Sequence, residues 1–239
     1  MYKRQDEDAV ANAIEDKKFT LIPENFRYIK NFLRLHNQPL VDGILADLGV
    51  SSHQFDSEQR GFSTRFDGEL DMRMTNKNEL SAKQIINEYG KDELKKILRE
   101  YGEVENAGKI TELILKSRTE KKINTAEQLK EIIKRCSPRA KENQFYAKVF
   151  QALRIEVNGE LDALIELLKQ SIQVLKPGGR LVVISYHSLE DRLVKNFMRS
   201  GNTEGKVEKD FFGNELGPFK VITRKAIVPT EEEIEINNR

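Results

Sequence analysis

The sequence predicts an α/β protein in which helices cover a parallel sheet and an all-helical segment is inserted between two of its strands. This prediction rests on two β-rich runs, residues 41–49 and 180–185. Each run is followed directly by polar residues. Strand and helix signals alternate around both runs, as is typical of parallel sheets. Between the runs, from about residue 81 to residue 148, only helical periodicity is present.

The N-terminal part alternates between helix and strand signals. Residues 8–14 predict a helix, residues 19–22 a short strand and residues 28–35 a second, amphipathic helix. Residues 41–49 predict a strand whose apolar run ends at polar groups. The polar segment 51–74, rich in Gly, Arg and Asp, is too long for a plain connector, and loops of this length are usually functional or disordered.

The helical segment has clear start signals. Ser81 followed by Gln84 resembles a capping box, and Thr125, followed by Glu127 and Gln128, is expected to cap the last helix of this segment. Further helices are indicated by apolar residues at helical spacing within 85–89, 94–101, 110–115 and 129–133.

The α/β pattern then resumes. The elements expected there are a helix over 150–176 that is broken near Asn158-Gly159, a stop at 177–179, a strand over 180–185, a helix over 190–198, and β segments at 219–223 and 225–228. Polar residues follow the second strand as they follow the first. In open α/β sheets ligands bind outside the carboxyl ends of strands, so both strand ends are candidate sites.

Composition narrows the class of protein. With 239 residues, 38% of them hydrophobic, the chain can fill the core of one large domain. No apolar run approaches the roughly 18 residues of a membrane helix, so we expect no membrane contact and a cytoplasmic location. Cys136 is the only cysteine, which excludes an internal disulfide and a multi-cysteine zinc site. Three scattered histidines give no reason to expect a metal.

Charge is segregated along the chain although the net charge is only +1. Residues 109–148 hold eleven Lys or Arg against five Asp or Glu, which gives +6, so the remainder carries −5. A solvated helical surface explains such an imbalance, and so does a surface that binds phosphates. The residues alone leave both explanations open.

Several strings resemble a known family. They are Asp47-Leu-Gly-Val-Ser-Ser52, Arg60-Gly-Phe-Ser63, Asp71-Met-Arg-Met74, Phe150-Gln-Ala-Leu-Arg-Ile155 with Val157-Asn158, and His187-Ser-Leu-Glu-Asp-Arg192. Together they closely resemble the bacterial 16S ribosomal RNA cytosine-N4 methyltransferase family, called RsmH or MraW. The resemblance implies a class I, Rossmann-like methyltransferase sheet. It divides the chain into a first methyltransferase part at 1–77, a helical insertion for RNA recognition at 78–148 and a second methyltransferase part at 149–239.

The resemblance also implies the chemistry. It implies transfer of a methyl group from S-adenosylmethionine to the N4 of a cytidine in the decoding region of 16S rRNA, in the small ribosomal subunit. Phe26, Asp47 and Gln54 fall on cofactor contacts. An amine whose lone pair is delocalised into the ring needs a positioned hydrogen-bond acceptor. The candidate catalytic residues are Asp47, Ser51, Ser52 and, as a second choice with Ser188, His187; Phe62 or Tyr186 is the candidate stacking surface for the base.

The chain also departs from the family pattern. The first sheet strand and its Gly-Gly-His-Ser turn are missing, Arg4 stands where an acidic residue is expected, and the basic run that follows Arg239 in the family is absent. We therefore expect an unpaired sheet edge, poor cofactor binding and weak or no turnover by this chain. The oligomeric state stays open, a dimer included.

Two other functions fit parts of the sequence. One is a noncatalytic RNA-binding fragment that keeps the helical insertion, although the presence of Phe26, Asp47 and Gln54 argues against it. The other is an amino-methyltransferase that acts on another nucleic acid or on protein. A nucleotide hydrolase is disfavoured, because no Gly-x-x-x-x-Gly-Lys-Ser/Thr loop occurs.

Overall fold

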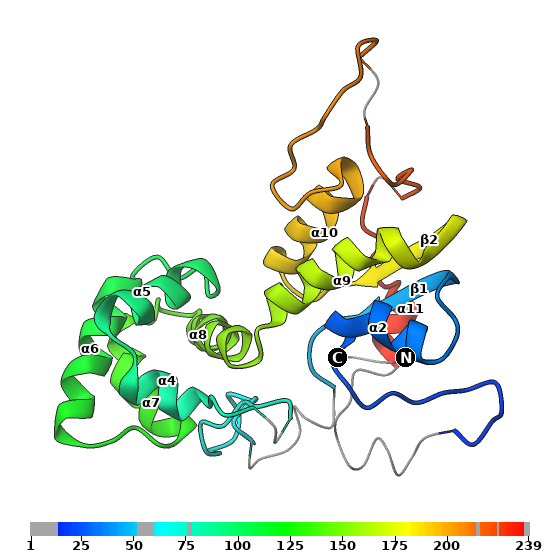
Figure 1. Cartoon of the computed structure of the whole chain (residues 1–239). Coiled ribbons are helices and arrows are strands. Elements are labelled where there is room, and N and C mark those ends of the chain that lie inside the picture. Colours follow the sequence, from blue (N-terminus) through cyan, green and yellow to red (C-terminus); the bar gives the residue numbers. More distant parts are fainter. Residues whose placement is uncertain (1–13, 52–59, 76–77, 214–215, 224, 237–239) are drawn as a thin grey trace. The chain divides into compact units, whose positions relative to one another are not determined.

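The computed structural model describes residues 14–51, 60–75, 78–213, 216–223 and 225–236 (Figure 1). The chain divides into two compact units, Met1–Leu189 and Glu190–Arg239. The elements are η1 (Phe26–Tyr28), α2 (Ile29–Leu35), β1 (Val41–Asp47), α4 (Ala82–Glu88), α5 (Lys91–Glu100), α6 (Ala107–Glu120), α7 (Ala126–Ile133), η3 (Lys134–Cys136), α8 (Glu142–Asn158), α9 (Glu160–Val174), β2 (Leu175–Ile184), α10 (Ser188–Ser200) and α11 (Glu231–Ile236).

The two predicted central strands form one parallel sheet. β1 pairs with β2 from Gly43 opposite Arg180 to Asp47 opposite Ile184, so their carboxyl ends lie at the same edge. The expected helix end and strand start need correction, because α9 stops at Val174 and β2 already includes 177–179. These residues bulge out of register. A side chain at Gly179 would come within 3.0 Å of the Asp42 carbonyl, so the bulge requires glycine there.

Helices cover the sheet from one side. α9 contacts β2, and both η1 and α2 pack on α9. Ile44 of β1 is buried, while its neighbour Leu45 is exposed together with Val182 and Ile184 of β2. Because side chains alternate between the two faces of a strand, these three apolar side chains line the other face of the sheet.

The helical segment has its own core. Its buried side chains come from the loop before α4 and from helices α4 to α8, between Phe62 and Val157. Both predicted caps are confirmed, and the one at Thr125 is also a full capping box. The Ser81 and Thr125 hydroxyls accept hydrogen bonds from the backbone N–H of Gln84 and Gln128, whose side chains return to the cap residues. The expected division at 148/149 lies within the continuous helix α8, and the assignment of 78–148 as a separate domain stays a prediction.

The predicted break near Asn158-Gly159 is confirmed. Gly159 adopts the left-handed conformation, with φ of +55°, between α8 and α9. Arg154 of α8 and Glu160 of α9 form a bidentate ion pair across this break, with Nε to Oε1 at 2.9 Å and Nη2 to Oε2 at 3.2 Å. Both side chains are largely buried. The pair therefore fixes the angle at which α9 leaves the helical core.

Three strand predictions are wrong. Residues 19–22, 219–223 and 225–228 are not strands in the structure. A strand needs a hydrogen-bonded partner, and among the described residues β1 and β2 pair only with each other. The acidic tail instead forms the short helix α11. Residues 8–13 of the first expected helix lie outside the described residues.

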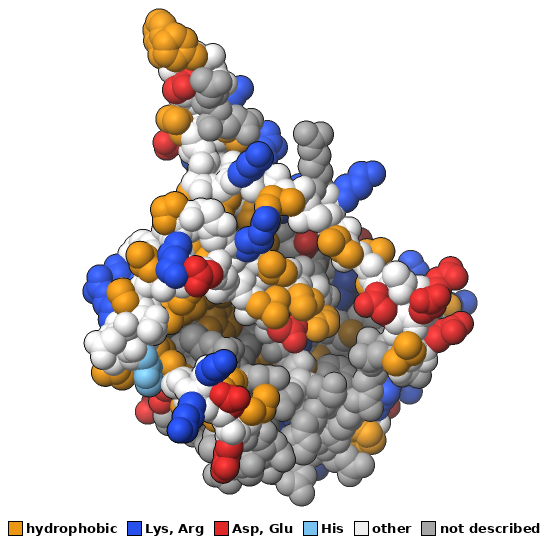
Figure 2. Space-filling model, turned by 90° about the vertical axis from the view of Figure 1, so that its right-hand side faces the viewer, with side chains coloured by type: hydrophobic (Ala, Val, Ile, Leu, Met, Phe, Trp, Pro, Cys, Tyr) orange, Lys and Arg blue, Asp and Glu red, His pale blue; other side chains and the backbone are white. Residues whose placement is uncertain are grey.

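The second unit carries exposed aromatic side chains. Phe211 and Phe212 are 98% and 86% exposed and contact each other edge to face. Figure 2 shows hydrophobic side chains, drawn in orange, at the tip at the top of the view. Among the described residues, none of the helices combines the length and hydropathy needed to cross a bilayer.

Candidate functional site at the carboxyl ends of the strands

The polar ends of the two strands meet, as the sequence predicts for parallel neighbours. The Tyr186 hydroxyl, just after β2, donates a hydrogen bond to Oδ1 of Asp47, the last residue of β1, over 3.0 Å. The Leu48 N–H donates to the Ile184 carbonyl, which extends the pairing one residue past β1. The Asp47 side chain is exposed at this edge. A carboxylate is thus held by a neighbour while remaining open to a ligand.

Gly49 shapes the turn that follows Asp47. Its φ is +83°, a conformation that L-residues rarely adopt, and an added Cβ would lie 3.3 Å from the Tyr186 ring. The backbone can therefore pass close to Tyr186 only with glycine here. Ser51, which follows this turn, is half-buried. Ser52 and Gln54 lie outside the described residues.

The other strand end is tied to the helical segment. The Ser188 hydroxyl donates a hydrogen bond of 2.8 Å to Oε2 of Glu103, a residue in the turn after α5 with φ of +48°. His187, beside Ser188, is half-buried. No sequence pattern indicates Glu103, because a contact between residues 85 positions apart leaves no local pattern.

The predicted aromatic residues differ in exposure. Phe62 is 5% exposed and belongs to the helical core, so it offers no surface on which a base can stack. Tyr186 is 67% exposed. Phe26 is 9% exposed in η1, which packs on α9. The Asn25 side chain caps this turn by accepting from the Arg27 N–H at 3.0 Å.

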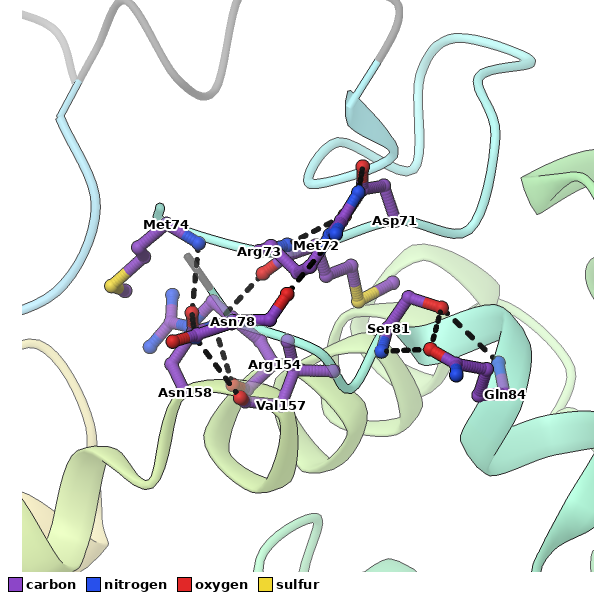
Figure 3. Close-up of polar contacts among 10 residues, drawn as sticks. All are labelled: Asp71, Met72, Arg73, Met74, Asn78, Ser81, Gln84, Arg154, Val157 and Asn158. Carbon is purple, nitrogen blue, oxygen red and sulfur yellow. Dashed lines mark hydrogen bonds and ion pairs between the residues drawn. The ribbon is translucent and has the colours of Figure 1, made fainter. Parts of the chain in front are cut away.

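Two of the recognised strings converge through Asn158, at the end of α8 (Figure 3). Its amide nitrogen donates to the carbonyls of Met72 and Arg154 at 2.8 and 2.9 Å. Its oxygen accepts the Met74 N–H at 2.8 Å and lies 3.4 Å from the amide nitrogen of Asn78. One side chain therefore pins the 71–74 string to α8.

Asp71 and Arg73 form an ion pair within the same cluster. The distances are 2.6 Å from Nε to Oδ1 and 3.0 Å from Nη2 to Oδ2, and Nη1 donates to the Asn78 carbonyl at 3.0 Å (Figure 3). Burial alone would raise the pKa of Asp71, but the hydrogen bonds and charge of Arg73 outweigh it and lower that pKa below its usual value. The Asp71 carboxylate thus stays charged and holds Arg73 in the position from which it also reaches the Asn78 carbonyl.

A third string packs on this loop. The Met72 N–H donates to the Arg60 carbonyl at 2.9 Å. Gly61 has φ of +66°, and an added Cβ would lie 2.1 Å from the Glu69 carbonyl oxygen. Only glycine allows the 60–63 string to lie against residues 69–72. The strings at 60–63, 71–74 and 154–158 therefore build one supporting structure.

Comparisons with known proteins agree with the strings. Residues 2–239 match the model of the MraW methylase family. The chain is 57% identical over 235 residues to ribosomal RNA small subunit methyltransferase H of Flavobacterium johnsoniae, covering 98% of this chain and 78% of the relative. It is 55% identical to the protein of that name from Bacteroides thetaiotaomicron, covering 98% and 77%. The resemblance seen in the sequence is confirmed, and the chain belongs to the MraW methylase family of class I methyltransferases.

Proposed function

We propose that the protein transfers a methyl group from S-adenosylmethionine to the N4 of a cytidine in 16S rRNA of the small ribosomal subunit, in the cytoplasm. The observation that carries this proposal is the exposed Asp47 carboxylate at the carboxyl end of β1, held by the Tyr186 hydroxyl from the next strand. Family membership and the names of the relatives support it. In this proposal, residues 78–148 recognise RNA.

The residues at the strand ends fit the cofactor. Gly49 leaves the backbone after β1 without a side chain, which suits close approach of a ligand. We assign cofactor contacts to Asp47 and Gln54, whose carboxylate and amide satisfy polar edges, and to Phe26, whose ring suits the adenine. When bound, S-adenosylmethionine supplies an electrophilic methyl group on a sulfonium.

The chain's own residues orient the amine. Asp47 accepts a hydrogen bond from the cytidine N4–H and so directs the nitrogen lone pair toward the methyl group. As the C–N bond forms, the bond from the methyl group to sulfur breaks, S-adenosylhomocysteine leaves, and the proton that N4 loses passes through Asp47 to solvent. The hydroxyls of Ser51 and Ser52 are alternative acceptors, and His187 with Ser188 is the second choice at the neighbouring strand end. Tyr186 orients the carboxylate through its hydroxyl, and its exposed ring offers a stacking surface for an extruded base.

A matched pair of variants at the two ends of β1 tests this proposal. Asp47→Asn keeps the side-chain shape but removes the charge, and Asp42→Asn makes the same change at the start of β1, where Asp42 forms an exposed ion pair with Lys176. We expect Asp47→Asn to lower kcat/KM for methyl transfer by roughly 100-fold or more. Asp42→Asn should stay within about twofold, because exposed ion pairs contribute little.

The assay is transfer of radiolabelled methyl from S-adenosylmethionine to a 16S rRNA fragment that covers the decoding region, with the modified base identified by nucleoside analysis. If the wild type methylates N4 of cytidine and Asp47→Asn has normal activity, then Asp47 does not have the role assigned to it. RNA binding without methylation would agree both with the weak or absent turnover expected of this chain and with the noncatalytic alternative, and titration of S-adenosylmethionine into a chain with the missing strands restored separates the two. Methylation of a different base or of protein would favour the other amino-methyltransferase.

A further inference from the structure

A short segment of the helical part concentrates positive charge. Residues 134–141, here called the 134–141 segment, hold Lys134, Arg135, Arg139 and Lys141 and contain no acidic residue. The segment runs from η3 through a turn to the start of α8. All four of these side chains are exposed. Four like charges within eight residues concentrate positive potential on this part of the surface, and such potential attracts anions.

Two other cations of residues 109–148, Lys130 and Arg118, serve the fold instead. The Lys130 ammonium donates to the Thr64 carbonyl at 3.1 Å and pairs with Glu127. The Arg118 guanidinium donates to the Ile86 carbonyl at 2.9 Å. Both cations therefore join the helices to their neighbours and are occupied within the protein.

The cations of the 134–141 segment are not occupied in this way. Among the residues that the structure describes, the Lys134 ammonium pairs only with the exposed Glu131, at 3.5 Å. The side chains of Arg135, Arg139 and Lys141 make no hydrogen bond or ion pair with any residue that the structure describes. Their charges are therefore available to a ligand. Guanidinium groups in particular match the geometry of phosphate oxygens.

The backbone around the 134–141 segment also favours the binding of an anion. Lys141 is the N-cap of α8 and makes no side-chain cap. The first amides of this 17-residue helix and its dipole consequently add positive potential beside the cations. Glu142 in the first turn opposes this potential with one charge. Asn106, at the start of α6, donates to the Cys136 carbonyl at 2.9 Å and fixes the segment in place.

We propose that the 134–141 segment binds the phosphate backbone of the RNA substrate, with Arg135, Arg139 and Lys141 as the contacting side chains. This inference rests on the proposed function, which supplies RNA as the substrate. The inference assigns the RNA contacts to residues 134–141 rather than to the whole region 78–148. Phosphate contacts position an RNA without reading its sequence.

A matched pair of triple variants tests the segment. R135Q/R139Q/K141Q removes three charges from it. K116Q/K121Q/K122Q removes three equally exposed and unoccupied charges from the other end of α6, within the described part of the chain. α6 has 14 residues and is about 21 Å long, and its start contacts Cys136. The control charges therefore lie well away from the segment.

The measurement is fluorescence anisotropy of a labelled 16S rRNA decoding-region fragment over a salt series, with the full chain and without cofactor. We expect R135Q/R139Q/K141Q to bind about tenfold or more weakly at ~0.1 M salt. The slope of log Kobs against the logarithm of the salt concentration should become less negative by about 2, because each lost phosphate contact removes ~0.7–0.9 from that slope. The control triple should stay within about threefold. R135K/R139K keeps the charge, so its dependence on salt should match that of the wild type.

Equal weakening by both triples, or no weakening by the first, would overturn the inference, as would a wild-type chain that does not bind the fragment. Circular dichroism and thermal unfolding check that each variant is folded. Binding is read without methyl transfer, so the two proposals can fail separately. Segment-dependent binding by a chain that methylates another base or a protein would reject the proposed function alone. Full methyl transfer with unchanged RNA affinity in the first triple would reject the segment alone.

Discussion

Asn158→Ala should be among the most damaging single changes outside the strand ends. The substitution removes three hydrogen bonds of 2.8 to 2.9 Å, to Met72, Arg154 and Met74. Met72 is fully buried, so its carbonyl loses a partner that water does not readily replace. At about 1 kcal/mol for each bond, with more for a group left unsatisfied, the loss is about 2–4 kcal/mol of unfolding free energy.

Urea unfolding followed by circular dichroism measures this loss. The matched control is Asn143→Ala, which makes the same change in the exposed first turn of α8 and should alter stability by less than about 0.5 kcal/mol. Asn158→Asp keeps the shape but replaces the donor with an oxygen facing two carbonyls, so it should destabilise at least as strongly. A loss below about 1 kcal/mol for Asn158→Ala would refute the hydrogen-bond reasoning.

Two further predictions concern charged pairs. Glu160→Ala leaves the largely buried Arg154 without its partner and should cost about 3 kcal/mol in urea unfolding, whereas Glu112→Ala, which breaks an exposed pair with a lysine, should cost less than about 1 kcal/mol. Asp71 has a lowered pKa in the folded protein. Its pairing with Arg73 therefore stabilises the folded state fully at pH values above the unfolded pKa of about 4, and this stabilisation is lost as the pH falls through the folded pKa. The stability difference between wild type and Asp71→Asn should therefore shrink between neutral and acidic pH; a constant difference would argue against this linkage.

The helices were predictable because their signals are local. Ser81 and Thr125 cap helices through residues three positions away, and Gly159 ends α8 through its own backbone conformation. The strands were less predictable, because pairing depends on residues far away in the sequence. Residues 19–22 have strand-like composition and still form no strand, and the Pro177–Gly179 stretch is a bulge inside β2 rather than a stop before it.

The strand-end geometry followed from one rule about parallel sheets. Since parallel neighbours end at the same edge, polar residues after β1 and after β2 had to come together, and Asp47 and Tyr186 do. The contact of Ser188 with Glu103 was not predictable, because it depends on where the helical segment folds back onto the sheet. Phe62 was assigned to the site from its residue type alone, and only packing shows that it belongs to the core.

The strings that carry the family resemblance therefore contain two kinds of residue. Asp47 is exposed at a strand end and is open to ligands, whereas Asn158 and Gly61 hold loop segments in place from within. Substitution of either kind should lower methyl transfer, but for different reasons. Asp47→Asn should remove activity at unchanged stability, because its side chain supports little of the core. Asn158→Ala should lower activity only to the extent that it unfolds the chain, so activity and unfolding measured on the same variants separate chemistry from support.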